Sequence, residues 1–213
     1  MDPRLNELLK WGVENSATTN DPSAPTPTST NGLNPEVIAA LFGGPSDADL
    51  MKESMAAILS TDPEVTLDDK LIAFDNFEQL IENLDNANNL GPLALWSPLL
   101  SCLAHKEDQI RKMAAWSIGT AVQNNEKSQE RLLALGAIPR LVELATSEDE
   151  NKEVRRKAVY ALSSESRNYQ PAMDVLTEEL EKTGRKYGKV DAADMAAVDA
   201  IITSLREEAS EAA

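Results

Sequence analysis

One short pattern in the sequence could belong to a metal-dependent enzyme, between His105 and Glu107. These residues have the H-x-E spacing of zinc deaminases, in which a histidine and two cysteines hold a zinc ion that activates water. Cys102 is the only cysteine of the chain, so the paired cysteines of such a site are missing. His105 is the only histidine, so neither a His-based triad with spare ligands nor a His-rich metal site can be assembled.

A second pattern, from Gly184 to Lys189, approaches a phosphate-binding loop. It has one residue fewer between its glycines than that motif requires, lacks the Ser or Thr after the lysine, and follows a helical pattern instead of a strand. Carboxylates are plentiful, but most lie on expected solvated helix faces and in loops, and none forms a pair that patterning would bury. We therefore expect that the protein is not an enzyme and needs no cofactor or metal.

The charge balance narrows the choice of partners. The 20 basic and 36 acidic residues give a net charge of −16, which repels nucleic acid and anionic membranes, so neither is expected as a partner. The single cysteine cannot form an internal disulfide, and no Asn-x-Ser/Thr glycosylation site and no membrane-spanning run occur. A cytosolic or nuclear setting follows as the default. Of the two we expect the cytoplasm, and we expect a monomer.

The elements that must position any binding residues are helical repeats. In the segment 110–144, IRKMAAWSIGTAVQNNEKSQERLLALGAIPRLVEL, helical periodicity places five apolar residues on one face: Ala114, Ala115, Ile118, Ala121 and Val122. The same face recurs about 44 residues later in Ala158, Val159 and Leu162, and about 41 residues earlier in Ala73, Phe74, Phe77, Leu80 and Ile81. Such a period is typical of armadillo or HEAT arrays, so we expect an all-α, armadillo-like solenoid.

The opposite face of these helices has the composition of a protein interface. It carries acidic residues in the first helix and aromatic and basic residues in the next two, including Trp116, Tyr160 and Arg167. If the repeats stack, these side chains form one stripe. The alternative is that loops or the ends of the chain cover Trp116 and Tyr160, since such residues are often mostly buried.

Composition divides the chain into four expected parts. Residues 1–34 combine a short amphipathic helix over 2–14, with Leu5, Leu8, Leu9 and Trp11, and a Ser/Thr/Pro-rich flexible tether. Residues 35–66 form an N-terminal helical cap, residues 67–180 the armadillo repeats, and residues 181–213 a loop with a capping helix. Helices are expected at 35–42, 46–60, 66–84, 92–104, 107–125, 126–135, 137–145, 154–167, from Pro171 onwards and at 192–209, with a charged surface loop at 147–153.

Four segments resemble one protein family. Residues 114–144 and 154–168, with 5–16 and 81–90, are similar to the armadillo-type nucleotide exchange factors of heat-shock protein 70 chaperones, in particular the Fes-type fungal branch related to the animal Hsp70-binding-protein factors. The resemblance implies a co-chaperone that binds the nucleotide-binding domain of a cytosolic chaperone, promotes ADP release and thereby releases the client. It also implies that Leu5, Leu8, Leu9 and Trp11 contact the chaperone's peptide-binding region.

In armadillo folds the third helix of each repeat lines a concave face, so the resemblance turns the stripe into a candidate chaperone-binding surface. Its expected residues are Lys112, Trp116, Thr120, Gln123, Asn124, Arg156, Tyr160, Ser164, Arg167 and Asn168. Arg167 is the preferred anchor, because a guanidinium can bind a carboxylate at two points. Asn124 could instead bond the backbone of the next repeat. The alternative function is an armadillo adaptor that binds extended peptides along the same groove.

Overall fold

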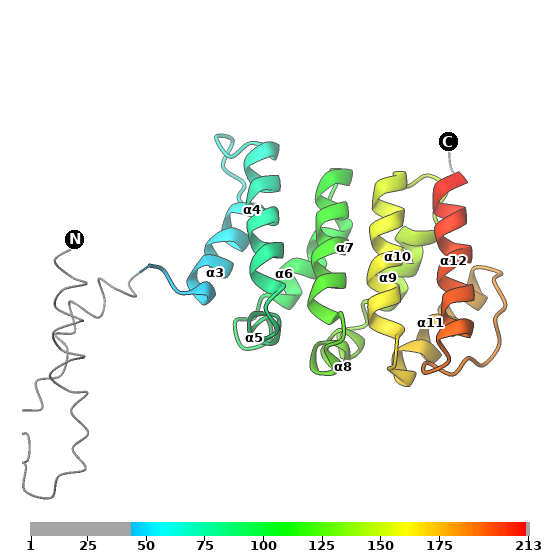
Figure 1. Ribbon diagram of the computed structural model, residues 1–213. Coiled ribbons are helices and arrows are strands. Elements are labelled where there is room, and N and C mark those ends of the chain that lie inside the picture. The colour runs from blue at the N-terminus through cyan, green and yellow to red at the C-terminus, as the bar shows by residue number, and fades with distance from the viewer. Residues whose placement is uncertain (1–43, 212–213) are drawn as a thin grey trace, which may run out of the picture. The chain divides into compact units, whose positions relative to one another are not determined.

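The computed structural model describes residues 44–211 of the chain, and these residues form helices, turns and loops without a strand. The expected all-α fold is therefore confirmed for this part (Figure 1). The expected helices at 2–14 and 35–42 lie outside the described residues. The elements are α3 (Asp47–Ile58), α4 (Leu67–Ile81), α5 (Leu84–Asn89), α6 (Trp96–Ser101), η1 (Cys102–Ala104), α7 (Asp108–Val122), α8 (Glu126–Ala134), α9 (Ile138–Thr146), α10 (Lys152–Ser166), α11 (Gln170–Lys182) and α12 (Met195–Glu211).

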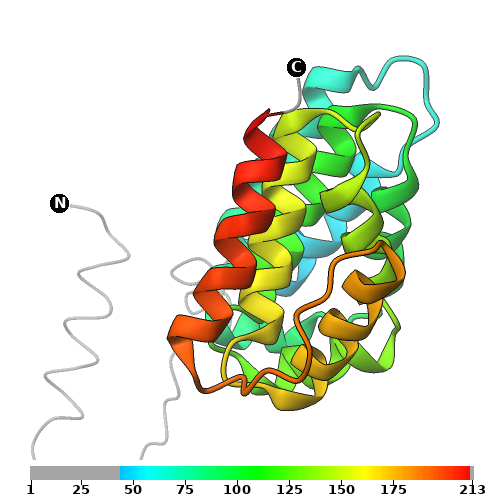
Figure 2. The same ribbon diagram turned by 90° about the vertical axis from the view of Figure 1, so that its right-hand side faces the viewer.

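Four long helices stand side by side in a row, in the order α4, α7, α10 and α12 (Figure 1). The first three run in the same direction, as stacked armadillo repeats require. α12 runs in the opposite direction, since Ser210 near its end accepts a hydrogen bond from Lys152 at the start of α10 (2.8 Å). Viewed along the row in Figure 2, α12 and α10 lie on one side of the molecule and α11 lies on the other.

The apolar residues that repeat along the sequence form the core of the protein. The five repeat positions of α7, from Ala114 to Val122, are at most 1% exposed, and Ala158, Val159 and Leu162 are equally buried in α10. In α4, Phe74, Phe77 and Ile81 occupy the same layer, whereas Leu80 is only partly buried against it. Stacking of one repeat on the next thus removes from water an apolar face that no single repeat could cover.

Capping residues decide where the helices begin and end. Thr66 and Asp69 form the expected capping box at the start of α4: Asp69 N donates to Thr66 Oγ1 (3.2 Å) and Thr66 N donates to Asp69 Oδ2 (2.9 Å). The helix expected over 66–84 ends at Ile81, because Asn83 caps the separate helix α5 by accepting hydrogen bonds from its first amides. The helix expected over 92–104 begins only at Trp96, after Ala94 adopts a left-handed φ of 56°.

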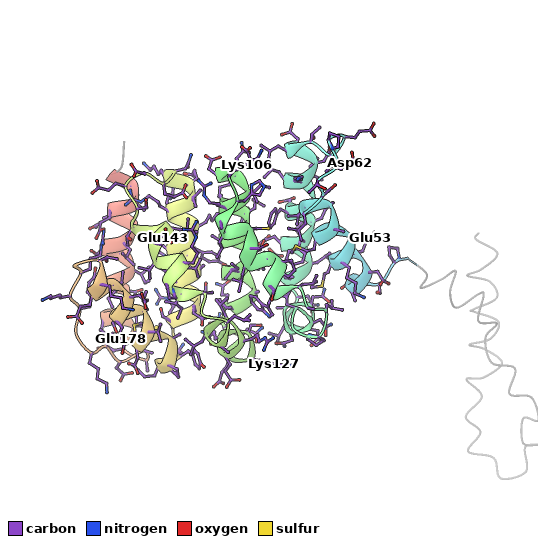
Figure 3. The ribbon with its side chains drawn as sticks, turned by 180° about the vertical axis from the view of Figure 1, so that it is seen from behind. Glu53, Asp62, Lys106, Lys127, Glu143 and Glu178 are labelled. Carbon is purple, nitrogen blue, oxygen red and sulfur yellow. The ribbon has the colours of Figure 1, made fainter. Side chains whose placement is uncertain are left out.

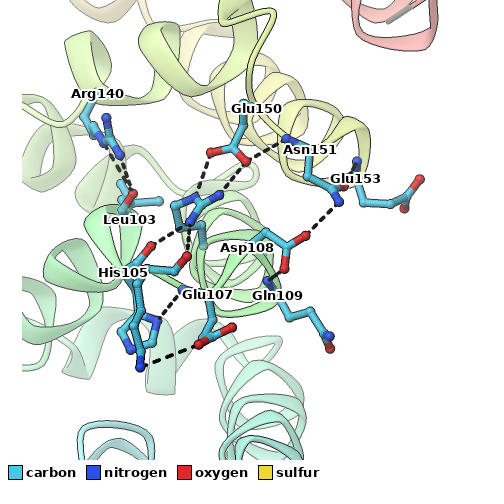
Figure 4. A network of polar contacts seen from close by, with 11 residues as sticks. Leu103, His105, Glu107, Asp108, Gln109, Arg140, Glu150, Asn151 and Glu153 are labelled. Carbon is cyan, nitrogen blue, oxygen red and sulfur yellow. Dashed lines mark hydrogen bonds and ion pairs between the residues drawn. The ribbon is translucent and has the colours of Figure 1, made fainter. Parts of the chain in front are cut away.

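The segment 147–153 is more than the charged surface loop that we expected. Arg111 at the start of α7 binds the carboxylate of Glu150 at two points, with Nε–Oε2 and Nη2–Oε1 distances of 2.7 Å. Its Nη1 also donates to the carbonyl oxygen of His105 (2.7 Å), and Asn151 Nδ2 donates to Asp108 Oδ2 (2.7 Å) (Figure 4). The Glu150 side chain is only 8% exposed. This network fixes the loop between two repeats to the start of α7.

Candidate functional site

We call the outward sides of α4, α7 and α10, which face the viewer in Figure 1, the row face. The expected binding residues on it differ in accessibility. Lys112, Trp116, Thr120, Tyr160 and Arg167 are half-buried, and Gln123, Asn124, Arg156 and Asn168 are exposed. Ser164 is only 7% exposed because the last turn of α10 is enclosed, with Glu165 and Ser166 buried as well. Its side chain therefore offers little surface to a partner.

The centre of the row face is an aromatic cluster held together by Lys157. The ammonium group of Lys157 lies 3.5 Å from the centroid of the Trp116 ring and 5.8 Å from that of Tyr160. Tyr160 Oη donates a hydrogen bond to Gln123 Oε1 (3.1 Å). Among the described residues, the group over the Trp116 ring is thus a cation from the next repeat and not a loop. Sequence reasoning missed Lys157, although its spacing of three residues from Tyr160 places both on one side of α10.

Gly119 allows α7 and α10 to approach closely at this cluster. A Cβ atom added to Gly119 would lie 2.5 Å from two carbons of the Tyr160 ring and 3.1 Å from the Cα atom of Ala161. The ring therefore lies directly on the glycine. Because an aromatic side chain packed on a helix backbone has few alternative rotamers, the cluster presents a fixed surface.

Thr120 connects the cluster to the first repeat. Its hydroxyl donates to Glu78 Oε1 of α4 (2.6 Å), and Glu78 is only 4% exposed. Burial lowers the pKa of Lys157, and the carboxylate of Glu78 partly opposes this effect. The neighbouring cations Lys112 and Arg156 lower the pKa of Lys157 further, and the carboxylate of Glu153 raises it.

Arg167, the expected anchor, has several partners within the chain. Its Nη2 forms an ion pair with Asp199 of α12, its Nε donates to Ser163 Oγ (3.0 Å), and its Nη1 contacts Met195 Sδ (3.5 Å). A guanidinium has five N–H donors, so these contacts leave two. The side chain remains 28% exposed. Arg167 can therefore receive a partner's carboxylate only beside Asp199 or in its place.

Asn124 and Asn168 have a backbone role that we did not expect from the sequence. They adopt left-handed φ angles of 52° and 56° directly after the residues that end α7 and α10. Asparagine tolerates this conformation better than other residues that carry a side chain. The bond to the backbone of the next repeat, which we considered for Asn124, is made by the buried Gln129, whose Nε2 donates to the carbonyl oxygens of Ser164, Glu165 and Arg167 (2.9, 3.0 and 3.2 Å).

A buried carboxyl group lies in the last turn of α10. Glu165 is 1% exposed, and neither of its carboxylate oxygens has a hydrogen-bond partner within the described part of the chain. Burial raises the pKa of Glu165 from its ordinary 4.5 to about 9, so the group is an uncharged acid at neutral pH. It offers no catalytic pair.

Other groups that could do chemistry are also sheltered or isolated. Burial raises the pKa of the Cys102 thiol to about 11, which makes it a poor nucleophile, and burial lowers the pKa of His105. Between residues 44 and 211, no group of three or more His, Cys, Asp or Glu side chains could hold a metal ion. Within the same range, no helix is both long and apolar enough to span a membrane. Leu5, Leu8, Leu9 and Trp11 lie outside the described residues.

Comparison with known proteins adds to this picture. Residues 5–90 match the family model of the nucleotide exchange factor Fes1, and residues 86–179 match that of the SIL1/FES1/HPBP1 C-terminal domain. The Hsp70 nucleotide exchange factor FES1 of Gibberella zeae is 66% identical over 99% of both chains, and fes-1 of Neurospora crassa is 51% identical over the full length of both. FES1 of Saccharomyces cerevisiae is 46% identical over 78% of this chain and 56% of its own. All ten expected binding residues lie in the second matched segment, and α12 lies beyond it.

Proposed function

The chain belongs to the fungal Fes1 family of Hsp70 nucleotide exchange factors, and we propose that it is a co-chaperone that binds a cytosolic Hsp70 chaperone and promotes the release of ADP. The observation that carries this proposal is the 66% identity, over 99% of both chains, with a relative named for that activity. Exchange of a nucleotide bound to another protein requires no catalytic residue. The buried Cys102 and the isolated Glu165 are in keeping with a protein that acts by binding alone.

The row face supplies the binding surface in this proposal. The side chains of Trp116, Tyr160 and Gln123 are held by contacts between repeats, so little conformational entropy is lost when a partner binds them. The row would bind the outer part of the second lobe of the nucleotide-binding domain and separate the two walls of the nucleotide cleft. A binding preference of about 4 kcal/mol for the open lobe would favour opening roughly a thousandfold. ADP then leaves, ATP binds, and the chaperone releases its client.

The N-terminal segment has a separate role in the proposal. Its apolar residues Leu5, Leu8, Leu9 and Trp11 would contact the chaperone's peptide-binding region and help to discharge the client. The protein would act as a monomer in the cytosol, because one row face per chaperone suffices for opening the cleft.

Release of a fluorescent ADP analogue from a cytosolic Hsp70, followed in stopped flow, tests the proposal. We expect acceleration by the full chain, loss of acceleration in Trp116→Ala and Arg167→Glu, and retained acceleration after deletion of residues 1–34. No acceleration at micromolar protein would contradict the exchange function. Binding of extended peptides to the same variants would then test the alternative role as a peptide adaptor.

A further inference from the structure

We propose that the part of the row face formed by α7 and α10 is a carboxylate-recognition site, in which Lys112, Arg156 and Lys157 bind an acidic patch of the chaperone around Trp116. This inference rests on the proposed exchange function and names the chemistry of the surface that the protein recognises. It differs from anchoring by Arg167, which lies at the other end of α10 and is paired with Asp199.

This region is less acidic than the rest of the chain, because three cations lie beside the three carboxylates of Glu78, Asp108 and Glu153. The protein has a net charge of −16, yet three cations gather where the second turns of α7 and α10 lie side by side. Burial is the main cause that lowers the pKa of Lys157; repulsion from Lys112 and Arg156 lowers it further, whereas Glu78 and Glu153 raise it. An anionic partner surface would relieve this repulsion on binding.

The anions near the cluster leave the cations available. Glu153 pairs with Arg156 at 3.5 Å, but both side chains are more than half exposed, so this pair is weak and screened by salt. Glu78 is buried and accepts the hydrogen bond of Thr120. Asp108 accepts hydrogen bonds from Asn151 and from the amide of Gln109. A hollow of about 200 Å³, lined by Lys112, Asp108 and Glu153 with Gln109, Asn151 and Val154, opens between the two helices beside the cluster.

Lys157 is the residue best prepared to bind a carboxylate. An ordinary surface lysine loses much side-chain entropy when it is fixed in an ion pair. The ammonium group of Lys157 is already fixed over the Trp116 ring and is partly desolvated by burial. Both effects strengthen the interaction with an incoming carboxylate, because less ordering and less loss of hydration remain to be overcome.

Charge variants of the full-length protein test this inference. The dissociation constant for an ADP-bound cytosolic Hsp70 would be measured by fluorescence anisotropy at low and at high salt, together with ADP release in stopped flow. Lys157→Met keeps an unbranched apolar side chain over Trp116 but removes the charge, Lys157→Glu reverses the charge, and Lys157→Arg keeps it. Lys127→Glu is the matched control. Lys127 is an exposed lysine on α8, and α8 does not belong to the row face (Figure 3).

We expect Lys157→Met to weaken binding about tenfold and Lys157→Glu about a hundredfold, with a smaller salt dependence than that of the unmodified protein. Lys157→Arg and Lys127→Glu should bind within about twofold of it. Thermal unfolding of each variant shows that the fold is retained. If the unmodified protein accelerates ADP release but Lys157→Met and Lys157→Glu bind with unchanged affinity and salt dependence, the inference is overturned and the exchange function stands. If the unmodified protein neither binds nor accelerates release, the proposed function itself fails.

Discussion

Replacement of Glu165 by glutamine should stabilise the protein at neutral pH. The pKa of Glu165 is about 9 in the fold and close to its ordinary 4.5 in the unfolded chain. Because the pKa is raised on folding, the contribution of this group to stability is fully present below about pH 4.5 and is lost as the pH rises towards 9. Each pH unit in this interval costs about 1.4 kcal/mol, so the loss over the roughly 2.5 units from pH 4.5 to pH 7 is about 3–4 kcal/mol.

Glutamine isolates the ionisation from other effects. It has nearly the same shape as the protonated acid and leaves similar polar atoms without partners, so the cost of burying an unpaired polar group is nearly unchanged. The Glu165→Gln variant should therefore match the unmodified protein near pH 4.5 and exceed its free energy of unfolding increasingly at higher pH. Glu178→Gln on α11 is the matched control, since Glu178 is exposed (Figure 3).

Urea unfolding of the three proteins at several pH values between about 5 and 8 measures the effect. The difference in free energy of unfolding between Glu165→Gln and the unmodified protein should grow by about 1.4 kcal/mol per pH unit. Glu178→Gln should show no such trend. Parallel pH curves for Glu165→Gln and the unmodified protein would mean that the carboxyl group ionises within the fold, and would refute the reasoning from burial.

Two backbone positions give further predictions. Gly119→Ala should lower the free energy of unfolding by about 1–3 kcal/mol and weaken chaperone binding, because the added Cβ atom displaces the ring of Tyr160. Urea unfolding measures the first effect and fluorescence anisotropy the second. Unchanged values would contradict the close packing of the ring on Gly119. Asn124→Ala should lower the free energy of unfolding by about 1 kcal/mol, because alanine is strained at a φ of 52°, and Asn124→Gly should lower it by less. Thermal unfolding measures the difference, and equal stabilities of the two variants would contradict this explanation.

The sequence was sufficient to predict the repeat helices and the row that they form. Periodic apolar residues such as Ile118 and Phe74 define the buried faces, and local pairs such as Thr66 and Asp69 define a helix start. These signals are local or repeat along the chain, so they need no knowledge of the tertiary structure.

Contacts between distant segments could not be predicted in this way. One local feature was also missed, because the asparagine cap that begins α5 lies within an otherwise helical pattern. The position of Lys157 over Trp116 depends on the exact stacking of two repeats, and the pairing of Arg167 with Asp199 depends on the reversed direction of α12, which no periodicity encodes. The polar contacts of the candidate site are therefore known only from the structure, although its position on the third helices was predicted from sequence.

The reversed direction of α12 also bears on self-assembly. An array of parallel repeats ends in a surface that matches the start of another copy, and such head-to-tail contacts can grow into open filaments. In this protein α12 packs against the side of α10 that faces away from α7. The solvent-exposed side of α12 carries small and polar residues such as Ala196, Ala200, Thr203 and Glu207. The first repeat of a second chain would need an apolar face and a parallel helix to stack on, and α12 offers neither. Head-to-tail polymerisation from this end is therefore opposed.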